Sequence, residues 1–249
     1  MHIGISGPIA AGKSTLAKSL QAVFDLIDIK TRIVPFAEDV KWMASLYGDT
    51  EIIPKLRIYL RKMNYDELTV AHGIAEVLYA FMLYPPVEGV KPRKLYQHIG
   101  TEAGRYTVDN DLWVKSVQAR IKGDTYNTYF ISDDVRFPNE ALALDYHVRI
   151  ALTSDAATEA YNARKALYPS EYFYNDHDSE TETLPTPHYT IPTNFTTVEV
   201  IHLAKTINHF ARKAIILTQN DLYSGFGKAL QEFGTGTSGV TAAMKKIQP

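Results

Sequence analysis

The chain contains no cysteine among its 249 residues. Disulfides, thiolate nucleophiles and zinc–thiolate sites are therefore excluded, and a reducing compartment is permitted. No apolar run approaches the roughly 20 residues that a membrane span needs. The first residues already resemble a strand rather than a charged and apolar leader, so the sequence predicts a cytoplasmic protein without a signal peptide.

Neither sign of charge dominates the sequence. It carries 26 basic and 28 acidic residues, which give a formal net charge of −2. A general attraction to a nucleic-acid polymer or to an anionic membrane is therefore not expected, and local groups must hold any phosphate ligand.

The first motif present is a phosphate-binding loop. Residues 7–14 read G-P-I-A-A-G-K-S, which matches G-x-x-x-x-G-K-S between an expected strand and an expected helix. Such a loop aims backbone N–H groups and a helix N-terminus at one point. Lys13 would reach the β and γ phosphates of a nucleotide, and the Ser14 hydroxyl would bind Mg²⁺. The alternative is a chance match in a turn rich in glycine and alanine.

Strand and helix patterns alternate along the chain. Buried strands are expected at 2–6, 31–36, 128–132, 147–152 and 189–192. Helices are expected at 13–24, 37–47, 54–83 (one or two), 94–106, 110–121, 138–144, 156–167 and 198–211. This alternation predicts an α/β fold in three layers, with a mainly parallel sheet covered on both faces by helices.

The organisation predicted from this pattern is one domain over residues 1–213. Residues 37–125 form a helical insert, and a polar stretch at about 153–183 is too long for an ordinary connection and is expected to act as a lid. Arg164 in that stretch would close over the donor phosphates. Residues 214–249 are rich in glycine and are expected to be an extension of unassigned role.

Acidic and basic residues follow the third expected strand. Asp133 and Asp134 stand at its carboxyl end, the edge where open α/β sheets bind ligands. A carboxylate there can hold Mg²⁺ opposite Ser14, or it can be a solvated loop acid. Arg136 has the planar fork that suits a phosphate, although Arg136 and Glu140 are also spaced for a surface ion pair.

A second dense cluster lies at residues 97–105. Gln97, Thr101 and Arg105 are four residues apart, so a helix would present them on one face that suits a base or a monophosphate. A solvated helix face is the alternative. Trp113 would either stack on a base or fill the core. Scattered bases precede the cluster, and two or three of them are expected to serve an acceptor phosphate: Lys41, Arg57, Arg61, Lys62, Arg93 and Lys94.

These motifs, in this order, resemble the phage deoxynucleoside monophosphate kinases. The resemblance covers roughly residues 1–210. It rests on the loop G-P-I-A-A-G-K-S-T, on F-A-E-D-V-K at 36–41, on Q-H-I-G-T-E at 97–102 with Arg105, on D-V-R-F-P-N-E at 134–140 and on H-D-S-E at 177–180. The pair of motifs G-T-E-x-x-R and D-x-R-x-x-x-E is much more specific than the loop.

The resemblance implies a P-loop kinase fold with a helical acceptor-binding region and a lid. The activity it implies is transfer of the ATP γ-phosphoryl group to a deoxynucleoside monophosphate with Mg²⁺, in the host cytoplasm if a phage encodes the chain. Its partners would be these small nucleotides, and a homodimer is left open. The motifs themselves and the resemblance together predict four groups of site residues. The ATP phosphates would be held by Gly7, Ala10, Ala11, Gly12, Lys13, Ser14 and Thr15; the acceptor would be held by Lys41, Gln97, Thr101, Arg105, Trp113, Asp134, Arg136 and Glu140; Lys13, Asp134 and Arg136 would act in catalysis; Ser14 and Asp133 would bind the metal.

Two features set the chain apart from that family pattern. Many members carry Asp after the loop lysine, where this chain has Ser14. The extension after about residue 213 has no recognised counterpart. Two other classes also remain open: another small-molecule P-loop kinase, such as one acting on dephospho-coenzyme A, and a nucleotide-switch or ATPase module acting on a protein.

Overall fold

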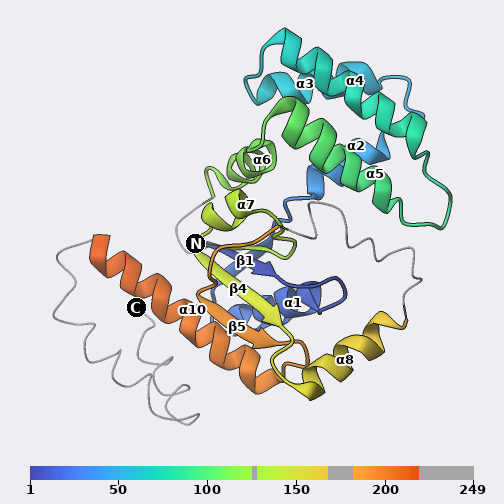
Figure 1. Ribbon diagram of the computed structural model, residues 1–249. Helices are drawn as coiled ribbons and strands as arrows, with labels where there is room; N and C mark the ends of the chain where they lie inside the picture. Colours follow the sequence, from blue (N-terminus) through green and yellow to red (C-terminus); the bar gives the residue numbers. More distant parts are fainter. Residues whose placement is uncertain (125–127, 168–181, 219–249) are drawn as a thin grey trace.

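A five-stranded parallel sheet forms the centre of the molecule (Figure 1). The computed structural model describes residues 1–124, 128–167 and 182–218. The strands are β1 (His2–Ser6), β2 (Lys30–Ile33), β3 (Thr128–Ser132), β4 (Tyr146–Ala151) and β5 (Tyr189–Pro192), in the order β2-β3-β1-β4-β5. Every pair is parallel, with Gly4 opposite Ser132 and Ser6 opposite Arg149. The predicted parallel sheet is confirmed, and β1 lies at its middle.

Two long helices pack on one face of the sheet. They are α1 (Lys13–Asp25) and α10 (Thr197–Thr218), which share one apolar cluster with the strands. Leu16 and Phe24 of α1 and Ile207 of α10 are fully buried in it. Because α10 continues to Thr218, it is longer than the expected helix at 198–211, and the boundary expected at 213 falls inside it.

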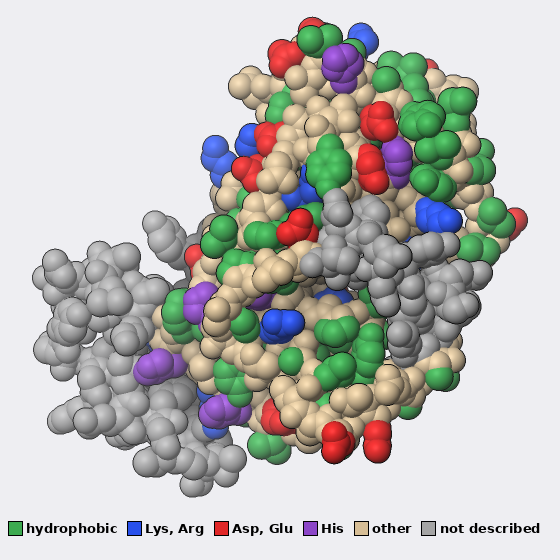
Figure 2. Space-filling view, in the orientation of Figure 1, with side chains coloured by type: hydrophobic (Ala, Val, Ile, Leu, Met, Phe, Trp, Pro, Cys, Tyr) green, Lys and Arg blue, Asp and Glu red, His purple; other side chains and the backbone are tan. Residues whose placement is uncertain are grey.

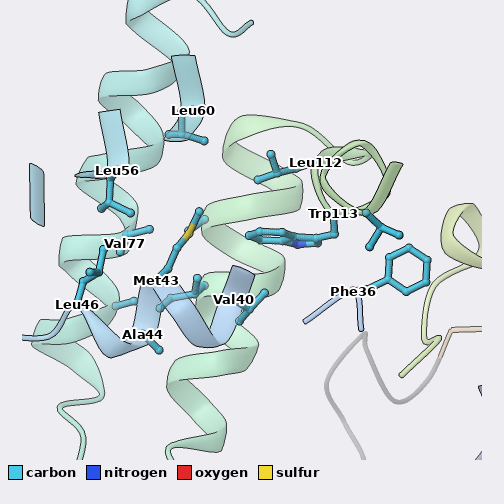
Figure 3. Close-up of a cluster of buried hydrophobic side chains, with 14 of the residues drawn as sticks. Phe36, Val40, Met43, Ala44, Leu46, Leu56, Leu60, Val77, Leu112 and Trp113 are labelled. Atoms are coloured by element: carbon cyan, nitrogen blue, oxygen red, sulfur yellow. The ribbon is translucent and has the colours of Figure 1, made fainter. Parts of the chain in front are cut away.

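The helices between β2 and β3 gather around a second apolar cluster, part of which is shown in Figure 3. They are α2 (Glu38–Ser45), α3 (Ile52–Lys62), α4 (Glu67–Leu83), α5 (Arg93–His98), η1 (Ile99–Val108) and α6 (Leu112–Ile121). The pattern at 54–83 is two helices, because Asn64 adopts φ 65° and Asp66 caps α4 by accepting from Leu68 N and Thr69 N. Figure 1 shows α3 and α4 farthest from the sheet.

The segment 94–106, expected to be one α-helix, changes its winding halfway. It is α-helical to His98 and then forms the π-helix η1, whose wider turn ends with Asp109 N donating to Gly104 O at 2.9 Å. Such helices are rare and recur at functional sites. Gly104 is required here by packing, because a Cβ would lie 2.3 Å from the Trp113 ring.

The remaining helices follow β3 and β4. α7 (Pro138–Leu142) packs through Ala141 with the second cluster, and α8 (Asp155–Lys165) follows β4. The expected lid is described only as α8 with its flanks and residues 182–183; the rest of it, including the H-D-S-E motif at 177–180, lies outside the described residues. Within the described part of the chain, no helix combines the length and the apolarity needed to cross a bilayer.

Candidate functional site

A cavity of about 720 Å³ opens where β1, β2 and β3 end. Its walls come from the start of α1, from α2, from the α5–η1 stretch and from the segment after β3. Because parallel strands place their carboxyl ends at one edge, segments separated by more than 90 residues meet in this one space. The parallel arrangement of the strands is therefore what forms this cavity.

The loop at residues 7–12 forms one end of the cavity. Gly7, Ala10 and Gly12 have φ of 144°, 64° and 95°, conformations that glycine adopts without strain and alanine does not. A Cβ at Gly7 would lie 2.7 Å from Ile150 O, so β4 also requires glycine there. Helix α1 begins directly after the loop, and the backbone N–H groups of its first turn have no partner within the helix.

Lys13 lies across this loop. Its Nζ donates to Gly7 O and to Pro8 O, both at 2.8 Å, and it lines the cavity. Burial, followed by the nearby Arg136 guanidinium, lowers the pKa of Lys13 to about 7. An anion that enters the cavity would raise the pKa of this lysine, because the nearby negative charge favours its protonated form.

Asp133 and Asp134 follow β3 but have different surroundings. Asp134 accepts from Phe36 N at 2.9 Å and from Ala37 N at 2.8 Å, so each of its oxygens holds the backbone at the start of α2. Burial raises the pKa of the Asp134 carboxyl. Among the described residues, the Asp133 carboxylate has no hydrogen bond or ion pair, and it faces the cavity. Asp133 is thus the carboxylate that can bind a cation.

Arg105 and Glu140 form a buried ion pair in the cavity wall. Each residue is only 3% exposed, and Arg105 Nη2 donates to Glu140 Oε1. Glu140 Oε2 also accepts from Arg136 N at 2.7 Å and from Phe137 N at 3.1 Å. The spacing that suggested a surface ion pair between Arg136 and Glu140 was therefore misleading, because the long-range partner Arg105 takes the carboxylate. Arg105 also stacks 3.7 Å from the centre of the Phe137 ring.

Positive charge exceeds negative charge in the cavity lining. Six cationic side chains and three acidic ones line it: Lys13, Lys41, Lys91, Arg93, Arg105 and Arg136 against Asp133, Asp134 and Glu140. The pKa of Lys91 is lowered by burial and then by Lys41, Arg93 and Arg136, which shows how closely these cations are grouped. On the face shown in Figure 2, the described acidic and basic side chains are instead interspersed.

Of the six scattered bases, Lys41 and Arg93 line the cavity. Arg57, Arg61, Lys62 and Lys94 are exposed and do not, and Arg61 pairs with Glu67. Sequence reasoning missed Lys91, which stands in a connection between two helices, two residues before Arg93. Its position in K-P-R, just before an expected helix, was the available signal.

Gln97, Gly100 and Thr101 form the opposite wall. The Gln97 Nε2 atom is buried and has no hydrogen-bond partner among the described residues. Trp113 is 2% exposed and donates from Nε1 to Gly100 O at 2.7 Å, so it belongs mainly to the core and only borders the cavity.

The cavity brings together most of the residues that the sequence singled out. Those lining it are Ala10, Gly12, Lys13, Ser14, Thr15, Lys41, Gln97, Thr101, Arg105, Trp113, Asp133, Asp134, Arg136 and Glu140. Gly7 and Ala11 do not line it: Gly7 shapes the loop, and Ala11 is buried against the sheet. The side chain of Arg164 lies outside what the structure describes.

Ser14 and Asp133 are the oxygen donors that a small cation would find at the loop end. Both line the cavity, Ser14 is exposed at the start of α1, and Asp133 follows the adjacent strand. Among the described residues, no group of three His, Asp or Glu side chains is arranged to hold a metal ion. Mg²⁺ in nucleotide sites typically takes one or two protein oxygens and completes its shell with phosphates and water, so these two donors fit it.

The fold and the cavity define an α/β protein with a cavity lined by charged residues at the carboxyl edge of a parallel sheet. Comparison of the chain with protein-family models, with curated proteins and with solved structures finds no match.

Proposed function

We propose that this chain is a P-loop kinase that transfers the γ-phosphoryl group of ATP to a deoxynucleoside monophosphate. The observation that carries the proposal is that one cavity is lined both by a glycine-bearing loop with Lys13 and by a second group of cations. The chain's net charge is −2, so the larger number of cations than acids in the lining is a local feature, and it suits a ligand with several negative charges.

The donor triphosphate would bind at the loop end. Backbone N–H groups at the start of α1 and the Lys13 ammonium would hold its β and γ phosphates. In the structure the Lys13 Nζ is occupied by two loop carbonyls, and phosphate oxygens would take their place. Ser14 and Asp133 would hold Mg²⁺, which when bound neutralises charge on the phosphates.

The acceptor monophosphate would bind between the loop and the α5–η1 wall. Lys41, Lys91 and Arg93 supply cations there, and Arg136 lines the same cavity and lowers the pKa of both Lys13 and Lys91. An acceptor held in this way has its phosphate near the outermost phosphate of the donor. Phosphoryl transfer depends mainly on such positioning and on electrostatic stabilisation of the transferred group.

Two residues support the site without meeting the reacting atoms. Asp134 fixes the start of α2, which carries Lys41, and Glu140 fixes Arg105 and the backbone of Arg136. We assign positioning roles to both. The direct catalytic role expected for Asp134 is not part of this proposal, because its two oxygens already accept backbone hydrogen bonds.

The direct test is the formation of diphosphate from each of the four standard deoxynucleoside monophosphates with ATP and Mg²⁺. We expect turnover with at least one of them. Lys13→Ala should lower turnover by about 100-fold or more, because it removes a preorganised charge from the transfer site. Lys18→Ala is the matched control, since Lys18 is exposed on the same helix and does not line the cavity.

The outcomes separate this proposal from its rivals. Phosphorylation of dephospho-coenzyme A alone would assign the chain to another class of small-molecule kinase. Hydrolysis of ATP without any phosphorylated small molecule would favour an ATPase module. Normal diphosphate formation by Lys13→Ala would contradict the donor site.

A further inference from the structure

Gly100 differs from the other glycines in the described part of the chain. Gly7, Gly12, Gly48, Gly89 and Gly123 adopt positive φ. At Gly4, Gly73 and Gly104 a Cβ would come within 2.0 to 2.5 Å of a neighbouring side chain. At Gly100 the nearest described atoms would be the two Val40 methyl groups, at 3.7 and 3.9 Å, which is ordinary contact. Neither backbone conformation nor packing within the described chain requires glycine there.

Glycine at this position weakens the fold. Gly100 lies near the start of η1, in a helical stretch that runs unbroken from Arg93, and glycine in a helix interior is less stable than alanine. Substitution by alanine at a compatible position normally stabilises a protein by restricting the unfolded chain. A glycine that packing does not require, and that also lines the cavity, is a position where a ligand can be the reason for the missing side chain.

The space left by the missing side chain opens into the cavity. Gly100 lines it between Gln97 and Thr101, and Figure 3 shows Val40 of α2 and Trp113 close to this helical stretch. Trp113 fixes the local backbone by donating to Gly100 O. The result is a recess with an apolar floor at Val40, bordered by the unpartnered Gln97 amide and the Thr101 hydroxyl.

Such a recess suits a thin, flat group with polar atoms on its edge. A bulky aliphatic group would be too wide for the recess. A phosphate would bring its negative charge into unfavourable contact with the Val40 methyl groups. We propose that the bare backbone at Gly100 receives the ring of the acceptor's base, and that Gly100 therefore sets which bases the site accepts. This inference rests on the proposed function and extends it to the recognition of the base.

The test uses Gly100→Ala and Gly100→Val as a graded series. The Ala side chain would contact the Val40 methyl groups at an ordinary distance, and Val adds further bulk next to the recess. We expect Ala to raise KM for the monophosphate about tenfold, the loss that corresponds to one displaced contact of about 1.4 kcal/mol, and Val to raise it further. KM for ATP should change by less than about twofold, since the donor binds at the other end of the cavity.

Two further measurements distinguish a loss of monophosphate binding from misfolding of the variant and from a failure of the kinase assay. The melting temperature of Gly100→Ala should stay level or rise by about 1 to 4 °C. Binding of monophosphate without ATP is followed by the emission of Trp113, with Trp42→Phe removing the other tryptophan of the chain. Ala119→Val, which adds bulk at an exposed position of α6 outside the cavity, is the control.

The results distinguish the inference from the function on which it rests. Normal diphosphate formation with unchanged monophosphate KM in both Gly100 variants would overturn the inference alone. Monophosphate binding by the parent protein that is lost in Gly100→Val, without diphosphate formation, would support the base recess and overturn the kinase proposal. An equal rise in KM for ATP, or no monophosphate binding at all, would overturn the inference.

Discussion

Lys13 occupies an unusual electrostatic position at the residue scale. Burial and Arg136 lower its pKa to about 7, while its Nζ donates to two loop carbonyls. A bound triphosphate would place negative charge beside the same nitrogen and raise its pKa again. Binding of ATP should therefore be coupled to the uptake of a proton by the protein.

This coupling can be measured by calorimetry at pH 8, where ATP itself is fully deprotonated. Titrations in two buffers of different ionisation enthalpy should show uptake of about 0.5 to 0.9 proton, since a group of pKa about 7 is mostly neutral at that pH before binding. Lys13→Met should abolish the uptake and Lys18→Met should keep it. ATP binding by the parent protein without any dependence on the buffer would contradict the prediction.

The buried pair of Arg105 and Glu140 makes a second prediction at this scale. Glu140→Gln keeps the shape but leaves the Arg105 charge uncompensated in a buried wall, so the free energy of unfolding should fall by about 3 kcal/mol or more. Urea denaturation measures the loss. Glu88→Gln, at an exposed position, should have little effect.

A double variant checks the physical reason for that loss. Adding Arg105→Gln to Glu140→Gln should cost much less than Arg105→Gln costs in the parent protein, because the stranded charge is then gone and only contacts such as the stacking on Phe137 are lost. Strictly additive losses would show that the two side chains act independently.

The sequence predicted the role of a residue when the residues that position it are its neighbours in sequence, and not when they are far away in sequence. The G-x-x-x-x-G-K-S pattern pointed to Lys13 and Ser14 because the loop and the helix that position them are contiguous in sequence. Glu140 was assigned to the acceptor, but its partner Arg105 lies 35 residues away, and no spacing rule reaches that far. Lys91 was missed although it stands only two residues before Arg93, because its local K-P-R signal does not show that tertiary packing brings this connection to the cavity.

At the scale of elements, one carboxylate connects the sheet to helix α2. Asp134, at the end of β3, accepts the N–H groups of Phe36 and Ala37 just before α2 begins. Those two N–H groups immediately precede the helix, so the helix itself offers them no hydrogen-bond acceptor. The tether therefore holds α2 and its Lys41 at the cavity.

Asp134→Asn should loosen this helix selectively. The Asn side chain offers one acceptor oxygen instead of two, so one N–H loses its partner. Hydrogen exchange of the α2 amides should accelerate about tenfold, which corresponds to roughly 1.4 kcal/mol, while α1 amides stay protected. Asp133→Asn is the matched control, because that carboxylate has no backbone hydrogen bond among the described residues. Unchanged exchange in α2 would rule out the tether.

Elements were predicted well where periodicity is strong and less well where it changes. The five strands and most helices appear within a few residues of their expected bounds. The π-helix η1 was not foreseen, because the fourfold spacing of Gln97, Thr101 and Arg105 fits an α-helix equally well. The order of the strands could not be read from the sequence either, since it depends on which β-strands pair after crossing over helices.

Two apolar clusters organise the molecule as a whole. One joins the sheet to α1 and α10, and the other joins the helices between β2 and β3. The cavity takes Lys13 and Ser14 from the first side, and Val40, Gln97 and Gly100 from the second. A ligand that contacts both ends should therefore tie the two parts of the structure together.

An adenosine–deoxynucleoside pentaphosphate, which links donor and acceptor in one molecule, tests this arrangement. A ligand at 100 times its Kd stabilises the folded state by about 2.7 kcal/mol, or roughly 5 to 10 °C in melting temperature for a chain of this size. Because one linked molecule avoids ordering two separate ligands, we expect it to raise the melting temperature more than ATP and monophosphate together at the same concentration. Lys13→Ala should reduce that shift strongly, and Lys18→Ala should preserve it. A shift no larger than that of ATP alone would mean that the two ends of the cavity are not occupied at once, and with that the transfer of a phosphoryl group between them would lose its structural basis.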